Sequence, residues 1–314
     1  MTEKDNSQAR EGFRDDLQRA GVLSPAGAPG LYDRHEQYER VTEKVNQLIT
    51  RTREETRFLF NDSAYTVHRF GPIFPAAVYD KTDYIASFPQ LTGIISTFEG
   101  GDREHKQLLR AHADGSTLNH LMSTSEVRMV SAACHPLYAR LPQTLPAAGV
   151  FSDVEGWCFR NEPSHDPMRQ QAFRMRELVF AGDASAATAF RATWIPHVTR
   201  MVSSIGLSSA EVSANDPFFG RFGKMLVEGQ LEHDLKTEFV VDIYGDGSEP
   251  VAIASCNDAQ DHFGTRFSLH DAQGNTAHTA CTAFGLDRIT LALFRTFGMN
   301  PDEWPLPVQK ALAL

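Results

Sequence analysis

The chain is poor in cysteine and in basic side chains, and it has no long apolar run. Its 314 residues include four cysteines, Cys134, Cys158, Cys256 and Cys281, which lie far apart without a Cys-x-x-Cys pair. This pattern argues against a disulfide framework and predicts a reduced compartment. No apolar stretch reaches the length that spans a membrane, and the polar N-terminus has no signal-peptide pattern. We therefore expect a cytoplasmic protein without a membrane partner.

Acidic side chains outnumber basic ones, 40 to 30, which gives a net charge of −10 and a pI of about 5.6. A protein that grips an RNA backbone usually carries a basic face, so this balance argues against tRNA as the main partner. The length is enough for a sizeable core in one large domain or two. No shift in composition divides the chain.

Residues 156–182 carry the most informative pattern and predict two strands joined by a polar loop. Period-two alternation places every second side chain of each strand on one face. An arginine and a glutamate from one strand, with a phenylalanine and a glutamate from the next, could hold a nucleotide. The alternative is a salt-bridged surface hairpin, because exposed Arg–Glu pairs are common. The residues that share these faces are Cys158, Arg160 and Glu162 on the first strand, and Phe173, Met175, Glu177 and Val179 on the second.

Other segments predict a scaffold of helices and strands. A charged helix is expected at about 33–55, and a hairpin at 235–256 turns at Gly245–Ser248. Residues 186–205 carry an aromatic stripe at helical spacing, which indicates either core packing or a partner surface. Apolar residues after Arg288 predict a helix that ends near Gly298. Residues 1–30 are expected to form a short helix and a loose lead-in.

Two of these segments resemble class II aminoacyl-tRNA synthetases, closest to the seryl type. Phe159-Arg160-Asn161-Glu162, followed by a loop and then by Phe173 and Glu177, is similar to motif 2. Ala283 to Arg288 before an apolar helix is similar to motif 3. The helix at 33–55 and the Pro-interrupted stretch 58–84 look like motif 1, the dimer-forming element. The resemblance covers roughly residues 36–298 and implies an α+β fold, with an antiparallel sheet flanked by helices, and a homodimer.

The resemblance also implies an ATP site with magnesium. Arg160 would meet the α-phosphate and Arg288 the terminal phosphate, and these two carry the catalytic role. Glu162 would meet the adenine amino group and Phe173 the ring. Ala252 stands where the family usually has a carboxylate for metal-bound ATP. The further residues that the resemblance places along ATP are Arg169, Gln170, Lys236, Ile253, Ala254 and Ser255.

The amino acid would be met by a second set of residues. Thr124 and Glu126 resemble the Thr-x-Glu segment of seryl-type enzymes, and Asn257 and Glu177 complete the set. The alternative for 123–127 is a strand end that caps a helix from Glu126 to Arg140, since Ser or Thr before an acidic residue is also an N-cap pattern. The residues alone leave both interpretations open.

Zinc follows from the same resemblance. Methanogenic-type seryl-tRNA synthetases and their truncated homologues hold zinc with a cysteine before motif 2, a glutamate on its second strand and a cysteine before motif 3. Cys134, Glu177 and Cys281 stand at these positions. Taken singly, a buried cysteine is most often a small hydrophobe. Three protein ligands would leave the fourth zinc position open for the substrate's amino group.

About 35 residues precede the first core-like helix, where seryl-type enzymes carry a large RNA-binding domain. We therefore expect a lead-in at 1–35 and a catalytic domain at 36–314, with a helical insertion at about 183–222 and no tRNA-binding domain. This organisation resembles the amino acid:carrier protein ligases, which adenylate glycine or alanine and pass it to the phosphopantetheine thiol of a carrier protein. The alternatives are a seryl-type tRNA synthetase catalytic subunit and a non-catalytic regulatory paralogue.

Overall fold

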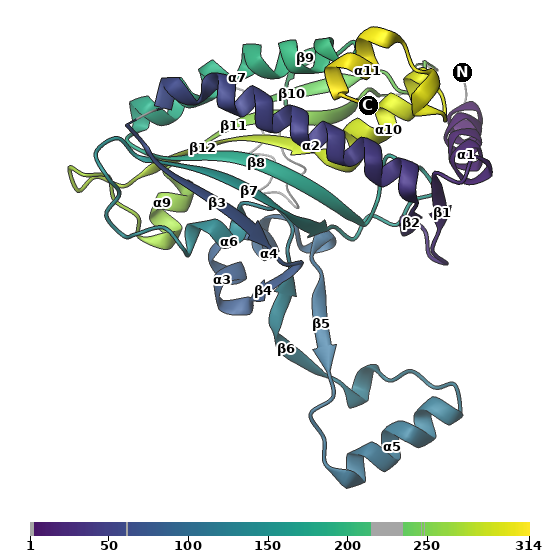
Figure 1. Cartoon of the computed structure of the whole chain (residues 1–314). Helices are drawn as coiled ribbons and strands as arrows, with labels where there is room; N and C mark the ends of the chain where they lie inside the picture. The colour runs from purple at the N-terminus through teal and green to yellow at the C-terminus, as the bar shows by residue number, and fades with distance from the viewer. Residues whose placement is uncertain (1–2, 61, 215–234, 246, 248) are drawn as a thin grey trace.

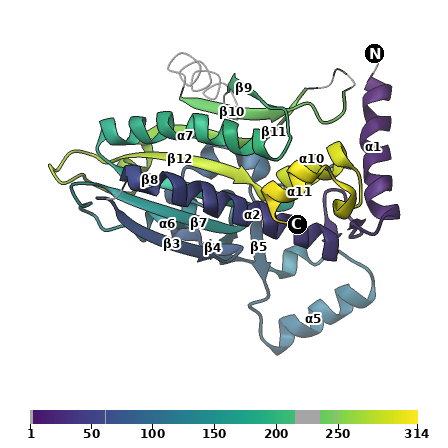
Figure 2. The ribbon, with the colours of Figure 1, turned by 45° about the horizontal axis from the view of Figure 1, so that its top comes forward.

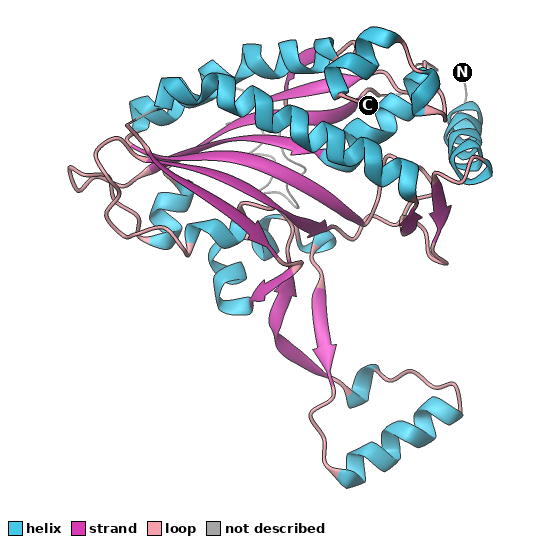
Figure 3. Cartoon of the chain, viewed as in Figure 1, coloured by secondary structure: helices cyan, strands magenta, loops and turns pink. Residues whose placement is uncertain are grey.

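The structure is a computed structural model that describes residues 3–60, 62–214, 235–245, 247 and 249–314. Within these ranges, seven strands form one sheet in the order β3-β7-β8-β12-β11-β10-β9. Every neighbouring pair is antiparallel except β3 and β7 (Figure 3). The strands are β3 Ala64–Phe70, β7 Val150–Phe159, β8 Ala172–Gly182, β12 His278–Gly285, β11 Val251–Gln260, β10 Lys236–Val241 and β9 Ala210–Ser213. The α+β prediction is confirmed.

The interior strand β8 is buried on both faces. Leu178 and Phe180 belong to one hydrophobic cluster, while Val179 and Ala181 belong to another on the opposite face. Alternating residues of a strand point to opposite faces, so this is the period-two pattern expected for the second strand of the 156–182 hairpin. β7 and β8 form that hairpin, with Phe159 opposite Ala172.

One face of the sheet is covered by long helices (Figures 1 and 2). Phe190 and Trp194 of α7 are fully buried against the sheet, so the aromatic stripe is core packing and not a partner surface. Arg191 of the same helix donates to Thr237 Oγ1 of β10 at 2.6 Å, so its side chain forms a contact within the fold. The predicted insertion at 183–222 therefore contains a core helix and then the edge strand β9, and residues 215–222 lie outside the described residues. The covering helices are α2 Glu36–Thr56, α7 Ala184–Ser204, α10 Leu286–Phe297 and α11 Leu306–Leu312.

Shorter elements lie beyond the other face, and one pair of strands extends away from the body. β5 and β6 lead to α5, which stands apart from the sheet (Figure 1) and buries none of its side chains. The helix expected from Glu126 to Arg140 is wrong, because residues 123–129 pair with two strands and a short helix begins only at His135. The elements are α3 Ala76–Lys81, α4 Tyr84–Ser87, α6 His135–Tyr138, α9 His262–Phe267, β4 Ile73–Pro75, β5 Ile94–Thr97, α5 Asp102–Ala113 and β6 Ser123–Met129. The 3-10 turns are η1 Arg57–Phe60, η2 Pro89–Leu91, η3 Asn119–Leu121 and η4 Pro301–Glu303.

The N-terminal segment is part of the core. α1 (Glu3–Arg19) buries Phe13 and Leu17, and β1 (Leu23–Pro25) pairs with β2 (Tyr32–Arg34). The expectation of a loose lead-in is therefore wrong, because two apolar side chains one helical turn apart anchor it in the same cluster as α2 and α10. Among the described helices, none is long and apolar enough to cross a membrane.

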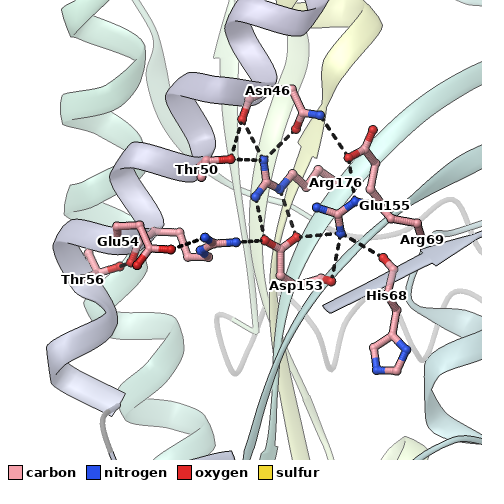
Figure 4. Close-up of polar contacts among 10 residues, drawn as sticks. Asn46, Thr50, Glu54, Thr56, His68, Arg69, Asp153, Glu155 and Arg176 are labelled. Atoms are coloured by element: carbon pink, nitrogen blue, oxygen red, sulfur yellow. Dashed lines mark hydrogen bonds and ion pairs between the residues drawn. The ribbon is translucent and has the colours of Figure 1, made fainter. Parts of the chain in front are cut away.

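A buried ion network ties α2 to the sheet (Figure 4). Arg176 of β8 donates to both carboxylate oxygens of Asp153 on β7, at 3.0 and 2.6 Å. Its remaining nitrogen reaches the Asn46 carbonyl and the Thr50 hydroxyl of α2 at 2.7 and 2.8 Å. Arg53 of α2 also donates to Asp153. Burial alone would raise the pKa of Asp153, but the hydrogen bonds and charge of Arg176 outweigh it and hold this pKa below its ordinary value.

Replacing this carboxylate should destabilise the whole fold. We expect Asp153→Asn to lower the free energy of unfolding by about 3–5 kcal/mol, because two buried arginines lose their counter-charge. Urea denaturation would measure the loss. Arg69→Ala is the matched control: Arg69 also contacts Asp153, at 3.3 Å, but its side chain is 45% exposed, so its loss should cost no more than about 1 kcal/mol. Equal stability of Asp153→Asn and the wild type would contradict the role given to this network.

Candidate functional site

A cavity of about 850 Å³ opens on the face of the sheet opposite α2 and α7. Strands β8, β10, β11 and β12 form its floor, and α4, α6 and α9 contribute to its walls. Predicted residues from segments as far apart in sequence as Cys134 and Arg288 gather here, because neighbouring strands present their alternate side chains to one face. The predicted residues that line the cavity are Cys134, Arg160, Glu162, Arg169, Gln170, Phe173, Glu177, Lys236, Ala252, Ile253, Ala254, Ser255, Asn257, Cys281 and Arg288.

Three of these residues are arginines whose charges act on one another. Arg288, in the first turn of α10, donates to the Ala252 carbonyl at 2.9 Å and to the Met168 carbonyl at 3.2 Å. Burial lowers the pKa of Arg288, and the nearby charges of Arg160 and Arg169 lower it further. Folding that brings three guanidinium groups together is unfavourable unless an anion compensates them. This cluster is therefore a candidate site for a polyphosphate.

The aromatic and carboxylate partners of the cluster lie beside it. The Arg160 guanidinium is 5.4 Å from the centroid of the Phe173 ring, and its Nε donates to the Ser131 carbonyl at 3.2 Å. Arg169 pairs with Glu162 at 3.0 Å and is 59% exposed. Lys236 of β10 pairs with Glu238 at 2.9 Å. The sequence pattern alone does not single out Glu238. The available signal was its position two residues after Lys236, on the same face of β10.

Cys134, Glu177 and Cys281 share one wall of the cavity. In the β8–β12 register Glu177 faces Ala283 and Val179 faces Cys281, so Glu177 and Cys281 are diagonal neighbours on one face. The Cys134 backbone N–H donates to Glu177 Oε1 at 3.3 Å. Within the described part of the chain, however, no group of three or more His, Cys, Asp or Glu side chains is arranged to hold a metal ion.

Burial raises the pKa of all three side chains on this wall. Burial raises the pKa of the Cys134 thiol, and the neighbouring Glu177 and Cys281 raise it further. Burial likewise raises the pKa of Cys281, with Glu177 as the next cause. The pKa of Glu177 is also raised by burial, although hydrogen bonds from Cys134 oppose the shift. A bound cation would favour the ionised form of two buried thiols and a buried carboxyl group, so the donor chemistry of this wall fits a metal.

Two predicted residues are not brought to the cavity. Thr124 and Glu126 are exposed on β6, in the small sheet that leads to α5, and neither lines the cavity. Thr124 pairs with Ser96 of β5 in that sheet. The pairing carries the segment away from the main sheet, so the structure does not support a contact of these side chains with a ligand bound among the other residues.

His135 and two aromatic rings were missed by the sequence interpretation. The His135 imidazole is buried beside the rings of Tyr84 and Phe263, at 5.5 and 6.1 Å between centroids. Its Nδ1 has no hydrogen-bond partner among the described residues, and burial lowers the pKa of His135 to about 3. The cavity therefore ends on a neutral imidazole among aromatic rings. A lone histidine after a cysteine gives no spacing signal from which this could be read.

The sequence pattern predicts no role for Asp287 beyond its place next to Arg288. Among the described residues at the site, however, it is the carboxylate that accepts the most hydrogen bonds. Its Oδ1 accepts from Arg34, Tyr38 and Arg174 at 3.1, 2.9 and 2.8 Å. Its Oδ2 accepts from the Arg174 backbone N–H at 2.5 Å. Burial would raise the pKa of Asp287, but the charges of Arg34 and Arg174 outweigh it and keep this pKa low. Asp287 thereby fixes the start of α10, which carries Arg288.

Comparison with known proteins places the chain among relatives. No family model matches it. It is 38% identical over 290 residues to amino acid:acyl-carrier-protein ligase 2 of Bradyrhizobium diazoefficiens, covering 92% of this chain and 84% of that protein. It is 35% identical to ligase 1 of the same organism, with 92% and 86% covered. The type-2 serine–tRNA ligase of Methanopyrus kandleri is 25% identical over 195 residues, which are 57% of this chain and 36% of that protein.

Solved structures show the same fold. A seryl-tRNA synthetase of M. kandleri, in complex with A. aeolicus tRNA, superposes with a TM-score of 0.76 at 19% identity, over 96% of this chain and 60% of that one. A cytoplasmic serine–tRNA ligase of Naegleria fowleri, in complex with AMP, gives 0.68 at 13% identity, over 96% and 65%. The chain thus spans about three fifths of the synthetases whose catalytic fold it shares.

Proposed function

Because the chain belongs to the amino acid:acyl-carrier-protein ligases, which its identity to the two Bradyrhizobium enzymes shows, we propose that it activates a small amino acid with ATP and transfers it to the phosphopantetheine thiol of a carrier protein. The observation that carries the proposal is the cluster of Arg160, Arg169 and Arg288 in one cavity with Phe173. The proposed amino acid is glycine or alanine.

In the first step, a carboxylate oxygen of the amino acid attacks the α-phosphorus of ATP, and pyrophosphate leaves. Arg160 compensates the charge that develops at the α-phosphate, as a positioned cation does in such a transfer. Arg169 and Arg288 hold the β- and γ-phosphates, which magnesium would also neutralise. Phe173 stacks on the adenine, and Glu162 accepts a hydrogen bond from its amino group.

In the second step, the carrier thiolate attacks the carbonyl carbon of the mixed anhydride. A thioester forms and AMP leaves with the bonding electrons of the C–O bond. We propose a carrier protein and not tRNA as the acceptor, on the strength of the relatives' names and the net charge of −10. Retention of all three arginines argues against a non-catalytic regulatory paralogue.

We further propose that Cys134, Glu177 and Cys281 hold zinc, although these side chains are near neighbours and not a preassembled site. Two thiolates and a carboxylate are a set that zinc accepts with a fourth position open. When bound, zinc would supply a Lewis acid for the α-amino group of the substrate. Asn257 donates a hydrogen bond to Cys281 Sγ at 3.3 Å and so holds that thiol in place within the wall.

A homodimer and a cytoplasmic location complete the proposal. β3 is an edge strand of the main sheet among the described residues, and its Val67 is 51% exposed. Such an edge with an apolar side chain is suited to cover by a second copy. All four cysteines are free thiols, in keeping with a reducing compartment.

The activation step is tested by pyrophosphate exchange. The protein should catalyse exchange of pyrophosphate into ATP that depends on glycine or alanine and not on added tRNA. Arg160→Ala should lower the rate by about 10²–10³-fold, because one preorganised donor to developing charge is lost. Arg103→Ala on the exposed helix α5 serves as control and should retain full activity. Near-normal exchange by Arg160→Ala would remove the assignment of the phosphate site.

The zinc proposal is tested by metal analysis. Purified protein should contain about one zinc per chain. Cys281→Ala should lose the metal and the amino-acid activation while remaining folded. Cys256→Ala is the control, because Cys256 is also a free cysteine of the main sheet but is fully buried in the cluster on the other face. Full activity of metal-free protein would refute a zinc role and leave the two cysteines as packing residues.

The acceptor is tested by labelling. Enzyme, ATP and radiolabelled glycine or alanine should be incubated with holo carrier protein, apo carrier protein or bulk tRNA. Label should appear on the holo carrier alone and be released by hydroxylamine, since a thioester is cleaved by that nucleophile. Label on tRNA, or on the apo carrier that lacks the thiol, would overturn the acceptor assignment.

A further inference from the structure

Arg34, at the end of β2, joins the N-terminal segment to the floor of the cavity. Its Nε donates to Asp287 Oδ1 at 3.1 Å. One terminal nitrogen donates to the Ala172 carbonyl at 2.8 Å and to the Gln170 side-chain oxygen. The guanidinium lies 4.8 Å from the centroid of the Trp157 ring, and the side chain is 11% exposed. A planar, donor-only group held at several points is fixed in position as well as in charge.

The contact with Gln170 sets the orientation of that amide. A guanidinium has no acceptor, so the atom of Gln170 that faces Arg34 must be the oxygen. The amide nitrogen is then forced to the other side. Gln170 lines the cavity and is only 7% exposed. Its Nε2 has no hydrogen-bond partner among the described residues. A buried donor without a partner costs free energy, and a ligand acceptor would satisfy it.

Other contacts join the N-terminal segment to Asp166 and Gln171 in the loop between β7 and β8, residues 160–171. The Gln171 backbone and side-chain nitrogens donate to the carbonyls of Gly30 and Pro29, both at 2.8 Å. Arg10 of α1 pairs with Asp166 at 3.4 Å. Gly30 has φ +80°, and a Cβ there would approach Gln171 Cγ to 3.1 Å. The N-terminal segment therefore holds the loop that carries Glu162, Arg169 and Gln170.

We propose that Arg34 is a positioning residue for nucleotide binding: it orients the Gln170 amide so that Nε2 donates to an acceptor atom of ATP. The inference rests on the proposed function for the identity of the nucleotide. It assigns a role in the ATP site to a side chain from the N-terminal hairpin, outside the β7–β8 hairpin and the β12–α10 junction that carry the phosphate-binding arginines.

Four proteins test it: Arg34→Ala, Gln170→Glu, the double variant, and Arg40→Ala. Gln170→Glu keeps an oxygen for Arg34 and the shape of the side chain, but it replaces the donor with an acceptor. Arg40→Ala is the control, because Arg40 forms an exposed ion pair with Asp302 at 2.8 Å and does not line the cavity. For each protein, KM for ATP, KM for the amino acid and kcat would be measured in pyrophosphate exchange, with the ATP dissociation constant measured by calorimetry.

We expect Arg34→Ala and Gln170→Glu each to weaken ATP binding by about tenfold, the range of one charge-assisted or buried hydrogen bond, with KM for the amino acid unchanged. Since Arg34 acts through Gln170, the double variant should bind ATP no worse than Gln170→Glu alone. Additive losses, or ATP binding by Arg34→Ala equal to that of Arg40→Ala, would overturn the proposal. A general distortion of the site would instead lower kcat and raise KM for the amino acid as well as KM for ATP. An unchanged KM for the amino acid therefore distinguishes the proposed local effect from such a distortion.

The outcome separates this inference from the proposed function. If the wild type fails to catalyse exchange with any amino acid, the proposed function falls, and the calorimetric ATP constants of the four proteins still decide the role of Arg34. If the wild type exchanges and the variants bind ATP normally, the function stands and the positioning role falls.

Discussion

The burial of both faces of β8 is the constraint on which the rest of the structure depends. Its even-numbered residues meet α2, α7 and α10, and its odd-numbered residues meet the cavity and the cluster beyond it. A slip of one residue would turn Leu178 and Phe180 to the cavity and Glu177 into the apolar layer under the helices. Both errors cost burial free energy, so the register of β8 is specified from two sides at once. The position of every ligand-facing side chain follows from that register.

Much of the cavity floor could be predicted because its pattern is local. Alternation within residues 156–182 is enough to place Phe173 and Glu177 on one face, and the hairpin is closed by a polar loop in sequence. The pairing of β8 with β12 is different, since about 100 residues separate Glu177 from Cys281. No periodicity in one segment encodes its neighbour in a sheet, and only the resemblance to a known family brought these two residues together. The ATP-facing residues of β11 were placed in the same way.

The failures have physical causes that concern contacts across the fold. Thr124 and Glu126 follow a spacing that is satisfied equally by a helix cap and by a ligand contact, and the structure instead pairs their segment with β4 and β5. Arg34 stands at the start of the segment expected as a charged helix, whereas the structure places it at the end of β2 and begins α2 at Glu36. Its importance comes from Asp287, Gln170 and Trp157, all more than 120 positions away, and side-chain bonds of that kind leave no trace in local pattern. The buried Asp153 network was missed for the same reason.

The local stability of helix α5 is separate from the stability of the main sheet. The side chains of α5 are all at least partly exposed, and among the described residues the strands β5 and β6 connect it to the body (Figure 1). Segments with few buried contacts open locally at a free energy far below that of global unfolding. Amide protons of α5 therefore exchange with solvent through the fraying of one helix, on a timescale that the sheet does not set. Amide protons of β8 and β12 exchange only when the two hydrophobic layers separate. Mutations in the core therefore change the exchange protection of the sheet and leave that of α5 unchanged.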